Sequence, residues 1–454
     1  MSKTMNKLNH SKHIELIYSE LIYQTNEFKK LLKKQAAKMF IDKELYLCRF
    51  QGFDKTRGNV LLKFDHSICL PPRRNEVLLC FLSKIQDDSV KNWGGMTYEK
   101  MRSQVVNQFE ARTIFFEYSG DSSIVGVSGI GTTDIENYKK NDLVFLAPND
   151  PPLQYLMNLH SYLVATNPSN EPILNLNIDN QKWKPKPLIV DDDIVHKIQL
   201  DFIETDTITI QGPPGTGKTY LMAKLCAAFL KGGFNTMVTA LTNRALVELA
   251  EKEFLAPALD KGMVFKSSLS ADEQRNRKLK GIQSFKSLGE QRPPLLLASY
   301  YVMSQIATSS MTGEHFDYII IEEASQAFLS TIAIAKKLGK KCIIIGDIKQ
   351  LEPIFRKEFP PDDPDNFHYM VCGLKAMSYY FPDSKQYILT DSYRLNERSV
   401  QATNSFYNDV LVSKSNHQFP LVFNNIKLDN RFNVMGGTSV MFISEYLTPS
   451  FRSV

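Results

Sequence analysis

A loop of small residues near the middle of the chain constrains the fold more than any other feature. Residues 211–219 read Q-G-P-P-G-T-G-K-T and lie between a short apolar run and an apolar, Ala-rich stretch. Glycines allow successive backbone N–H groups to turn toward one anion, and a helix that begins there directs its positive end at the same anion. In this pattern the lysine reaches the terminal phosphates and the last hydroxyl can bind Mg²⁺. The sequence therefore predicts a nucleoside triphosphate site made of Gly212, Pro213, Gly215, Thr216, Gly217, Lys218 and Thr219.

The composition is that of an ordinary globular protein of several domains. The chain has 454 residues, of which 43% are hydrophobic and 23% charged, and its net charge of +5 is compatible with a nucleic-acid partner. Its six cysteines lack C-x-x-C spacing, which predicts reduced thiols and neither a zinc site nor a disulfide framework. The sequence contains no apolar run long enough for a membrane span and no signal peptide, so we expect a cytoplasmic protein, with the nucleus as an alternative.

The first 190 residues predict an accessory region. Residues 1–43 include apolar positions at helical spacing and indicate a helical stalk, whose lysines are either a solvated face or phosphate contacts. Residues 44–150 contain short strand-like runs separated by turn residues, which indicate a small β-barrel or sandwich. Residues 151–190 read as a helix followed by a linker rich in Pro, Asn and Lys.

Residues 191–360 alternate apolar strands with amphipathic helices, which predicts an α/β domain with a parallel sheet. The expected strands are Thr207–Ile210, Thr236–Ala240, Leu295–Ala298, Tyr318–Ile321 and Cys342–Ile345. Residues 266–292 are polar and basic and suggest a mobile insertion, with Lys266, Arg275, Arg277, Lys278, Lys280 and Lys286 available to a polyanion. The Pro- and Asp-rich stretch 360–365 marks a boundary, and residues 361–454 are expected to begin a second domain and to include a strand at Thr438–Ile443.

Two further motifs follow buried strands. Asp317–Gln326 reads D-Y-I-I-I-E-E-A-S-Q, so Glu322 and Glu323 stand where an apolar strand emerges. There the first carboxylate can hold Mg²⁺ and the second can orient and deprotonate an attacking water. Gly346–Pro353 reads G-D-I-K-Q-L-E-P, and the amide of Gln350 can sense a γ-phosphate.

These motifs, with Ser392-Tyr393-Arg394-Leu395, stand in the order and approximate spacing of superfamily 1 helicases. The chain most resembles the 5′-to-3′ branch that includes RNA-surveillance helicases and the helicase parts of replication nucleases. The resemblance covers roughly residues 190–445 and implies a P-loop RecA-like parallel sheet with helices on both faces. It also implies a stalk and barrel before the sheet and the start of a second RecA-like domain after it. About 47 residues follow Tyr407, too few for a domain of about 100–150 residues, so we expect the second domain to be incomplete here.

The resemblance assigns roles to individual residues. Lys218, Glu323, Gln350 and Arg394 would be catalytic, with Arg394 as an arginine finger, and Thr219 and Glu322 would hold Mg²⁺. Tyr393 would stack on the base. Gln199, one helical turn later than the family's base-reading glutamine, is the remaining cofactor candidate. Strand contacts would come from Thr242, Asn243, Ser299 and Tyr300, although Tyr300 is equally suited to packing beneath the sheet. The family usually has Asp where this chain has Glu322.

Three functions are compatible with these patterns. The first is an NTP-dependent, Mg²⁺-requiring helicase or translocase, with ATP as the first candidate nucleotide and single-stranded DNA or RNA as its partner. The second is an NTP- and nucleic-acid-binding regulatory or sensor subunit that unwinds nothing itself, for example in a phage-defence complex. In either case another protein chain could complete or regulate the motor. A metabolic kinase or GTPase is disfavoured because neither explains E-E-A-S-Q and G-D-x-x-Q together.

Overall fold

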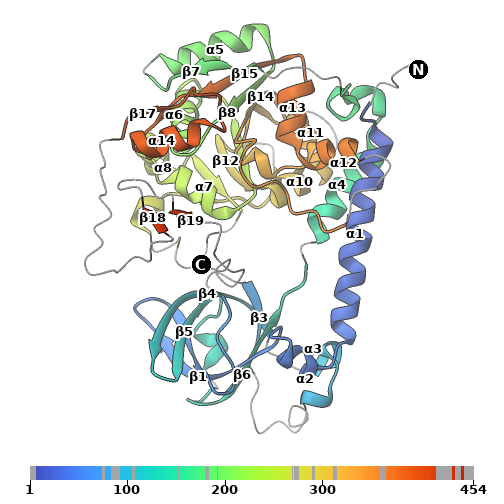
Figure 1. The fold of residues 1–454 in the computed structure, drawn as a ribbon, viewed down its shortest axis with the longest axis vertical. Helices are drawn as coiled ribbons and strands as arrows, with labels where there is room; N and C mark the ends of the chain where they lie inside the picture. The colour runs from blue at the N-terminus through green and yellow to red at the C-terminus, as the bar shows by residue number, and fades with distance from the viewer. Residues whose placement is uncertain are drawn as a thin grey trace.

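The computed structural model places a small β-barrel and a large α/β domain at opposite ends of a long helix (Figure 1). It describes residues 7–415 except 74–76, 83–92, 105–107, 137, 152, 179–183, 192, 268, 270–272, 274–275, 289–291, 310–313 and 358–363, together with 432–434 and 441–443. None of the described helices is both long and apolar enough to cross a membrane.

The barrel confirms the β-rich prediction. Its strands are β1 (Tyr46–Asp54), β2 (Asn59–Asp65), β3 (Val77–Leu82), β4 (Gln108–Ser119), β5 (Ser122–Ser128) and β6 (Leu143–Pro148). They close in the order β1-β2-β5-β4-β3-β6, and every pair is antiparallel. Side chains on alternate positions, such as Val60, Leu62, Val125 and Val127, are fully buried inside, as the two-residue period of a strand requires.

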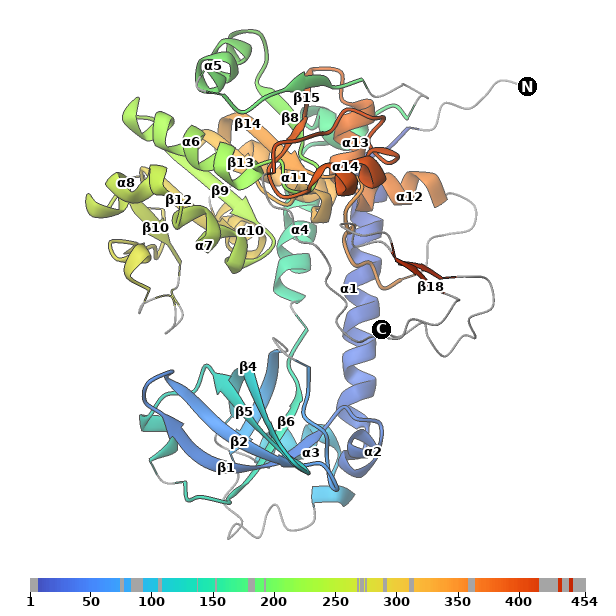
Figure 2. The same ribbon diagram turned by 60° about the vertical axis from the view of Figure 1, so that its left-hand side comes forward.

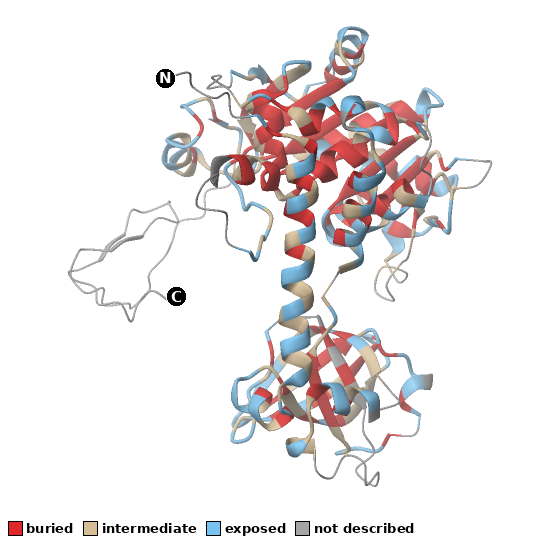
Figure 3. Cartoon of the chain, turned by 90° about the vertical axis from the view of Figure 1, so that its right-hand side faces the viewer, coloured by how far each residue is buried: buried red, intermediate tan, exposed pale blue. Residues whose placement is uncertain are grey.

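Helix α1 (His10–Lys33) forms the stalk between the two bodies (Figure 2). Asn9 caps its first turn by accepting a hydrogen bond from the backbone N–H of Lys12. Leu16 and Ile17 are buried in the core of the α/β domain, whereas the residues of the following turns are intermediate or exposed except for the buried Glu20 (Figure 3). Its last turns pack beside α2 (Ala36–Ile41) and α3 (Tyr98–Gln104) on the barrel side.

The α/β domain is built on a sheet in which all nine strands are parallel. Their order is β11-β10-β12-β9-β13-β14-β8-β15-β7. The strands are β7 (Lys186–Leu188), β8 (Thr207–Gln211), β9 (Thr236–Ala240), β10 (Val264–Lys266), β11 (Gln283–Ser284), β12 (Leu295–Ser299), β13 (Phe316–Ile321), β14 (Gly339–Gly346) and β15 (Ser384–Leu389). Because all run the same way, the segments that leave their carboxyl ends meet at one edge of the sheet.

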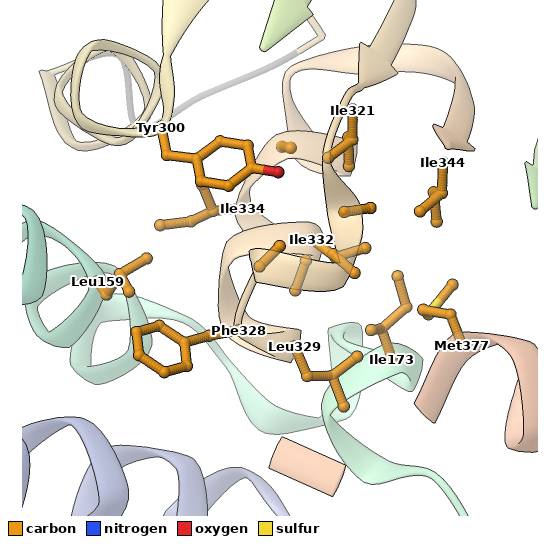
Figure 4. Close-up of a cluster of buried hydrophobic side chains, with 14 of the residues drawn as sticks. Leu159, Ile173, Tyr300, Ile321, Phe328, Leu329, Ile332, Ile334, Ile344 and Met377 are labelled. Carbon is orange, nitrogen blue, oxygen red and sulfur yellow. The ribbon is translucent and has the colours of Figure 1, made fainter. Parts of the chain in front are cut away.

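Helices cover both faces of this sheet, as predicted. One face packs against α5 (Ile194–Glu204), α6 (Lys218–Lys231), α7 (Asn243–Ala250) and α8 (Ala256–Asp260). The other packs against α1, α4 (Leu153–Ala165), α10 (Tyr300–Ser309), α11 (Leu329–Lys337), α12 (Pro364–Val371) and α13 (Gly373–Tyr380). Successive residues of β13 alternate between the two cores, so Ile320 faces the first and Ile321 the second (Figure 4 shows the second). Each such fully buried isoleucine contributes about 1.5–3 kcal/mol to the free energy of folding.

The predicted boundary at residue 361 is wrong. Strand β15 pairs with β8 and is the second strand from one edge of the same sheet, and Tyr387 and Leu389 are buried in its core. Helix α13 belongs to the same domain, since its Met377 packs with α11 and η5 (Pro172–Asn175) in one core (Figure 4). The first domain therefore continues through residue 389.

Residues 151–190 are likewise part of this domain and not only a helix and linker. Leu159 and Leu163 of α4 and Leu174 of η5 lie in the core, and β7 forms the edge strand beside β15. Sequence periodicity did not reveal β7 because its three residues include a proline, which an edge strand tolerates.

The described parts of the stretch 266–292 are folded, so the prediction of a mobile insertion is wrong for them. Strands β10 and β11 extend the sheet, and Leu279 and Phe285 are buried. Lys266, proposed as a contact for a polyanion, is 2% exposed, and its ammonium lies 3.3 Å from the Glu273 carboxylate. Arg275 lies outside the described residues.

The chain after β15 folds back over the phosphate loop. Strand β16 (Asp391–Ser392) pairs with β17 (Val412–Ser413), and α14 (Glu397–Asn404) lies between them in sequence. A small core of Ile388, Val400, Tyr407 and Leu411 holds this segment together. Farther on, β18 (Phe432–Val434) and β19 (Met441–Ile443) form an antiparallel pair; β19 falls within the strand expected at 438–443, whose first three residues are not described.

Candidate nucleotide site and strand interface

The phosphate loop connects β8 to the first turn of α6, as the sequence predicts. Gly215 and Gly217 adopt positive φ angles of 73° and 82°, a region that glycine enters without strain. The hydroxyl of Thr216 donates to the Pro213 carbonyl at 2.8 Å, which closes the loop on itself. The Gly212 N–H donates to the Gly346 carbonyl at 2.8 Å, which ties the loop to the end of β14.

Lys218 lies across this loop. Its ammonium donates to the Gly212 carbonyl at 2.5 Å and lies 3.4 Å from the Pro213 carbonyl. Burial lowers the pKa of Lys218, and the carboxylate of Asp347 opposes this shift. An ammonium group that is largely buried and held among carbonyl oxygens is suited to bind phosphate oxygens.

Glu322 and Thr219 meet beside the loop. The Thr219 hydroxyl donates to Glu322 Oε1 at 3.2 Å, while Glu322 Oε2 is buried and has no hydrogen-bond partner among the described residues. Burial, with the neighbouring charge of Glu323, raises the pKa of Glu322 to about 8. A hydroxyl beside a carboxylate with a spare buried oxygen fits Mg²⁺, which takes oxygen ligands.

Glu323 turns out of the strand at a sharp corner. Its φ of 52° is left-handed, which is unusual for a residue with a side chain, and its Oε2 is buried without a hydrogen-bond partner among the described residues. The side chain is half-buried, and burial followed by the charge of Glu248 raises its pKa. A carboxylate with a raised pKa beside a phosphate loop can accept a proton from water.

The segment after β15 sits directly on the loop. The Tyr393 N–H donates to the Gly215 carbonyl at 2.9 Å, and the Ser392 hydroxyl donates to the Pro214 carbonyl at 3.1 Å. A Cβ placed on Gly215 would lie 2.4 Å from the Arg394 Cβ. The side chains of Tyr393 and Arg394 are exposed at the rim of the loop.

A buried polar cluster that sequence reasoning missed holds the turn carrying Gln350. Asp347 is fully buried; it accepts a hydrogen bond at 2.5 Å from Gln211 and one at 2.7 Å from the Tyr407 hydroxyl. Gln211 in turn accepts from the Ile348 N–H at 3.0 Å. Gln350 ends this turn with its side chain exposed. The G-D pair that follows the buried strand was the available signal, but the partners come from segments 60 or more residues away.

Comparison with known proteins finds relatives of the part of the chain that carries the phosphate loop. Residues 196–356 match a family model described as an AAA domain. An uncharacterized ATP-dependent helicase of Methanocaldococcus jannaschii is 32% identical over 145 residues, which are 30% of this chain and 20% of the relative. The DNA replication ATP-dependent helicase/nuclease DNA2 of Homo sapiens is 27% identical over 161 residues, 34% of this chain and 15% of the relative. The matched part of this chain is thus similar to ATP-dependent helicases.

The matched part spans a fifth or less of the length of these curated relatives. Among solved structures, the chain is similar to the arterivirus nonstructural protein 10 helicase in complex with DNA, with 14% identity and a TM-score of 0.28. The match covers 53% of this chain and 49% of that chain. It is also similar to the Pyrococcus furiosus Hef helicase domain, with 16% identity, coverage of 46% and 39%, and a TM-score of 0.26.

The predicted nucleic-acid contacts divide into two groups. Thr242 caps α7 by accepting from the Ala245 N–H at 3.2 Å, and the exposed Asn243 follows it. Ser299 ends β12 and accepts from the Val302 N–H at 3.3 Å. These three residues lie at the carboxyl edge of the sheet.

The assignment of Tyr300 as a nucleic-acid contact is wrong. Its side chain is 1% exposed and points into the core (Figure 4), and its hydroxyl donates to the Glu322 carbonyl at 2.6 Å. Tyr300 therefore positions the acidic pair of the motor from beneath. Gln199 lies half-buried in α5, and the described hydrogen bonds do not connect it to the phosphate loop.

Proposed function

We propose that this chain hydrolyses a nucleoside triphosphate, with ATP as the first candidate, and uses the energy to move along single-stranded DNA or RNA. One observation carries the proposal: Lys218, the Thr219–Glu322 pair and the Tyr393-Arg394 segment surround a single phosphate loop, although they come from three strands of the sheet. A kinase or GTPase is disfavoured because neither explains the Glu322-Glu323 pair together with the turn that carries Gln350.

Each residue has a distinct task in this proposal. Lys218 attracts the terminal phosphates. Thr219 and Glu322 would hold Mg²⁺, which neutralises the charge that develops on the phosphoryl oxygens. Glu323 accepts the proton of the attacking water, Gln350 orients that water, and Arg394 adds positive charge from the opposite side of the loop.

Movement along a strand would use the same edge of the sheet. Thr242, Asn243 and Ser299 supply hydroxyl and amide groups suited to phosphate contacts, which do not depend on sequence. The Tyr393-Arg394 segment would transmit the state of the nucleotide, because its backbone is bonded to the loop itself.

The test is hydrolysis of ATP by the full chain with Mg²⁺, in the wild type and in Lys218→Ala. A matched control is Lys231→Ala, since Lys231 ends the same helix with an exposed side chain. We expect Lys218→Ala to lose at least about 100-fold in rate, in the range seen when one transition-state donor is removed, and Lys231→Ala to keep the wild-type rate. Full activity in Lys218→Ala would reject the assignment.

Strand displacement separates movement from the regulatory alternative. Unwinding of a tailed duplex by the isolated chain would support a translocase, whereas hydrolysis stimulated by single strands without unwinding would support a sensor or regulatory subunit.

A further inference from the structure

Three side chains able to bind a metal ion gather where the segment after β14 meets α12. His368 and Cys372 are four residues apart and therefore face the same side of the helix end. Their Nδ1 and Sγ atoms are 3.8 Å apart, and Glu352 Oε1 lies 3.8 Å from His368 Nε2. One ligand atom from each of the three residues can be chosen so that all lie within 4.8 Å of one another.

We propose that Glu352, His368 and Cys372 form a zinc site. Zinc binds thiolate sulfur at about 2.3 Å and imidazole nitrogen at about 2.0–2.1 Å in tetrahedral geometry, which places the two donor atoms about 3.6 Å apart. The observed 3.8 Å between His368 and Cys372 needs almost no movement. A soft sulfur ligand selects zinc over Mg²⁺ or Ca²⁺. Binding releases the Cys372 thiol proton to solvent, and water would complete the coordination.

Lys375 occupies the opposite side of the His368 ring from Cys372. Its ammonium lies 3.1 Å from His368 Nε2 and 3.6 Å from Glu352 Oε1, between two of the proposed ligands. When Nδ1 binds zinc, Nε2 carries the ring proton and can no longer accept a hydrogen bond, so zinc binding must displace the ammonium. Lys375 and His368 side chains are each 31% exposed, whereas Cys372 is buried, so the ion can enter from the solvent side and the lysine can leave the same way.

The position of the site gives it a consequence for the motor. Glu352 follows Gln350 by two residues, so a bound zinc would tie the turn carrying Gln350 to α12. This consequence rests on the proposed hydrolysis. Zinc binding itself does not, and it can be measured without nucleotide.

The experiment titrates the full, metal-stripped chain with Zn²⁺ against a chromogenic chelator, and with Co²⁺ while recording thiolate-to-cobalt charge-transfer absorption. We expect one equivalent per wild-type chain and a loss of about tenfold or more in affinity in His368→Ala and Cys372→Ser. Cys69→Ser is the matched control, because Cys69 is a more accessible thiol in the barrel and should leave both signals unchanged.

Lys375→Met keeps the result interpretable if a ligand variant folds poorly. Removal of the competing ammonium should raise zinc affinity about tenfold, a gain that a damaged fold would not produce. Two outcomes would overturn the proposal: no stoichiometric binding by the wild type, or binding that is equal in the wild type, Cys372→Ser and Lys375→Met. Either would mean that the cluster is only an ion-pair network around Lys375.

Discussion

Substitution of Gly215 by alanine tests whether the Tyr393-Arg394 segment packs on the phosphate loop. Gly215 has a φ of 73°, where a side chain costs about 1–2 kcal/mol. The added Cβ would also lie 2.4 Å from the Arg394 Cβ and 3.2 Å from its backbone nitrogen, so the segment must shift. Forced overpacking of this kind costs about 1–3 kcal/mol more. We therefore expect Gly215→Ala to lose about 2–5 kcal/mol of unfolding free energy.

Gly233→Ala is the matched control, because Gly233 has a φ of 77° and no atom within 4 Å of an added Cβ. Gly233→Ala should lose only the unfolding free energy that comes from a side chain at positive φ, about 1–2 kcal/mol. Urea denaturation of the α/β domain, followed by fluorescence, measures both. Equal losses in the two variants would refute the packing of the segment on the loop, whereas partial recovery in Gly215→Ala/Arg394→Gly would locate the clash.

Three further predictions concern buried polar groups. Burial raises the pKa of Glu322 from 4.5 to about 8, so between these pH values the folded state keeps a proton that the unfolded state has lost. The free energy of unfolding without Mg²⁺ should therefore fall by a few kcal/mol from pH 5 to pH 8. Glu322→Gln should remove this pH dependence in denaturation experiments. Glu20 is fully buried in α1 and accepts hydrogen bonds from the backbone N–H groups of residues 356 and 357. Glu20→Gln should therefore lower the free energy of unfolding by about 1–3 kcal/mol in thermal denaturation. Glu15→Gln, on the exposed face of the same helix, should leave it unchanged. Tyr407→Phe leaves the buried Asp347 with one donor fewer and should cost about 1–3 kcal/mol by urea denaturation; no change would contradict the buried cluster.

The strands of the motor sheet could be predicted because they are fully buried. Apolar runs such as Tyr318–Ile321 need no context to be recognised, and the parallel order then brings Lys218, Glu322 and Arg394 to one edge. Short edge strands such as β7 and β11 escaped prediction, because two or three residues carry no periodicity.

The errors in the site arise from contacts between distant segments. Tyr300 follows a strand end like a typical ligand contact, but its burial depends on how α10 packs against α11, which no local pattern records. The boundary at 361 was placed by its prolines, whereas β15 joins the first sheet by pairing with a strand about 180 residues earlier, as in the register of Gln386 with Thr209. The polar cluster around Asp347 depends on the same long-range pairing.

Strand-stimulated hydrolysis tests the central claim most directly. The ATPase rate of the full chain with Mg²⁺ should be measured alone, with single-stranded DNA, with single-stranded RNA and with blunt duplex. A nucleic-acid-driven motor predicts a severalfold rise with at least one single strand, absent in Lys218→Ala and smaller with the duplex. A rate that no single-stranded polymer changes would contradict the account, even if the phosphate loop hydrolyses ATP.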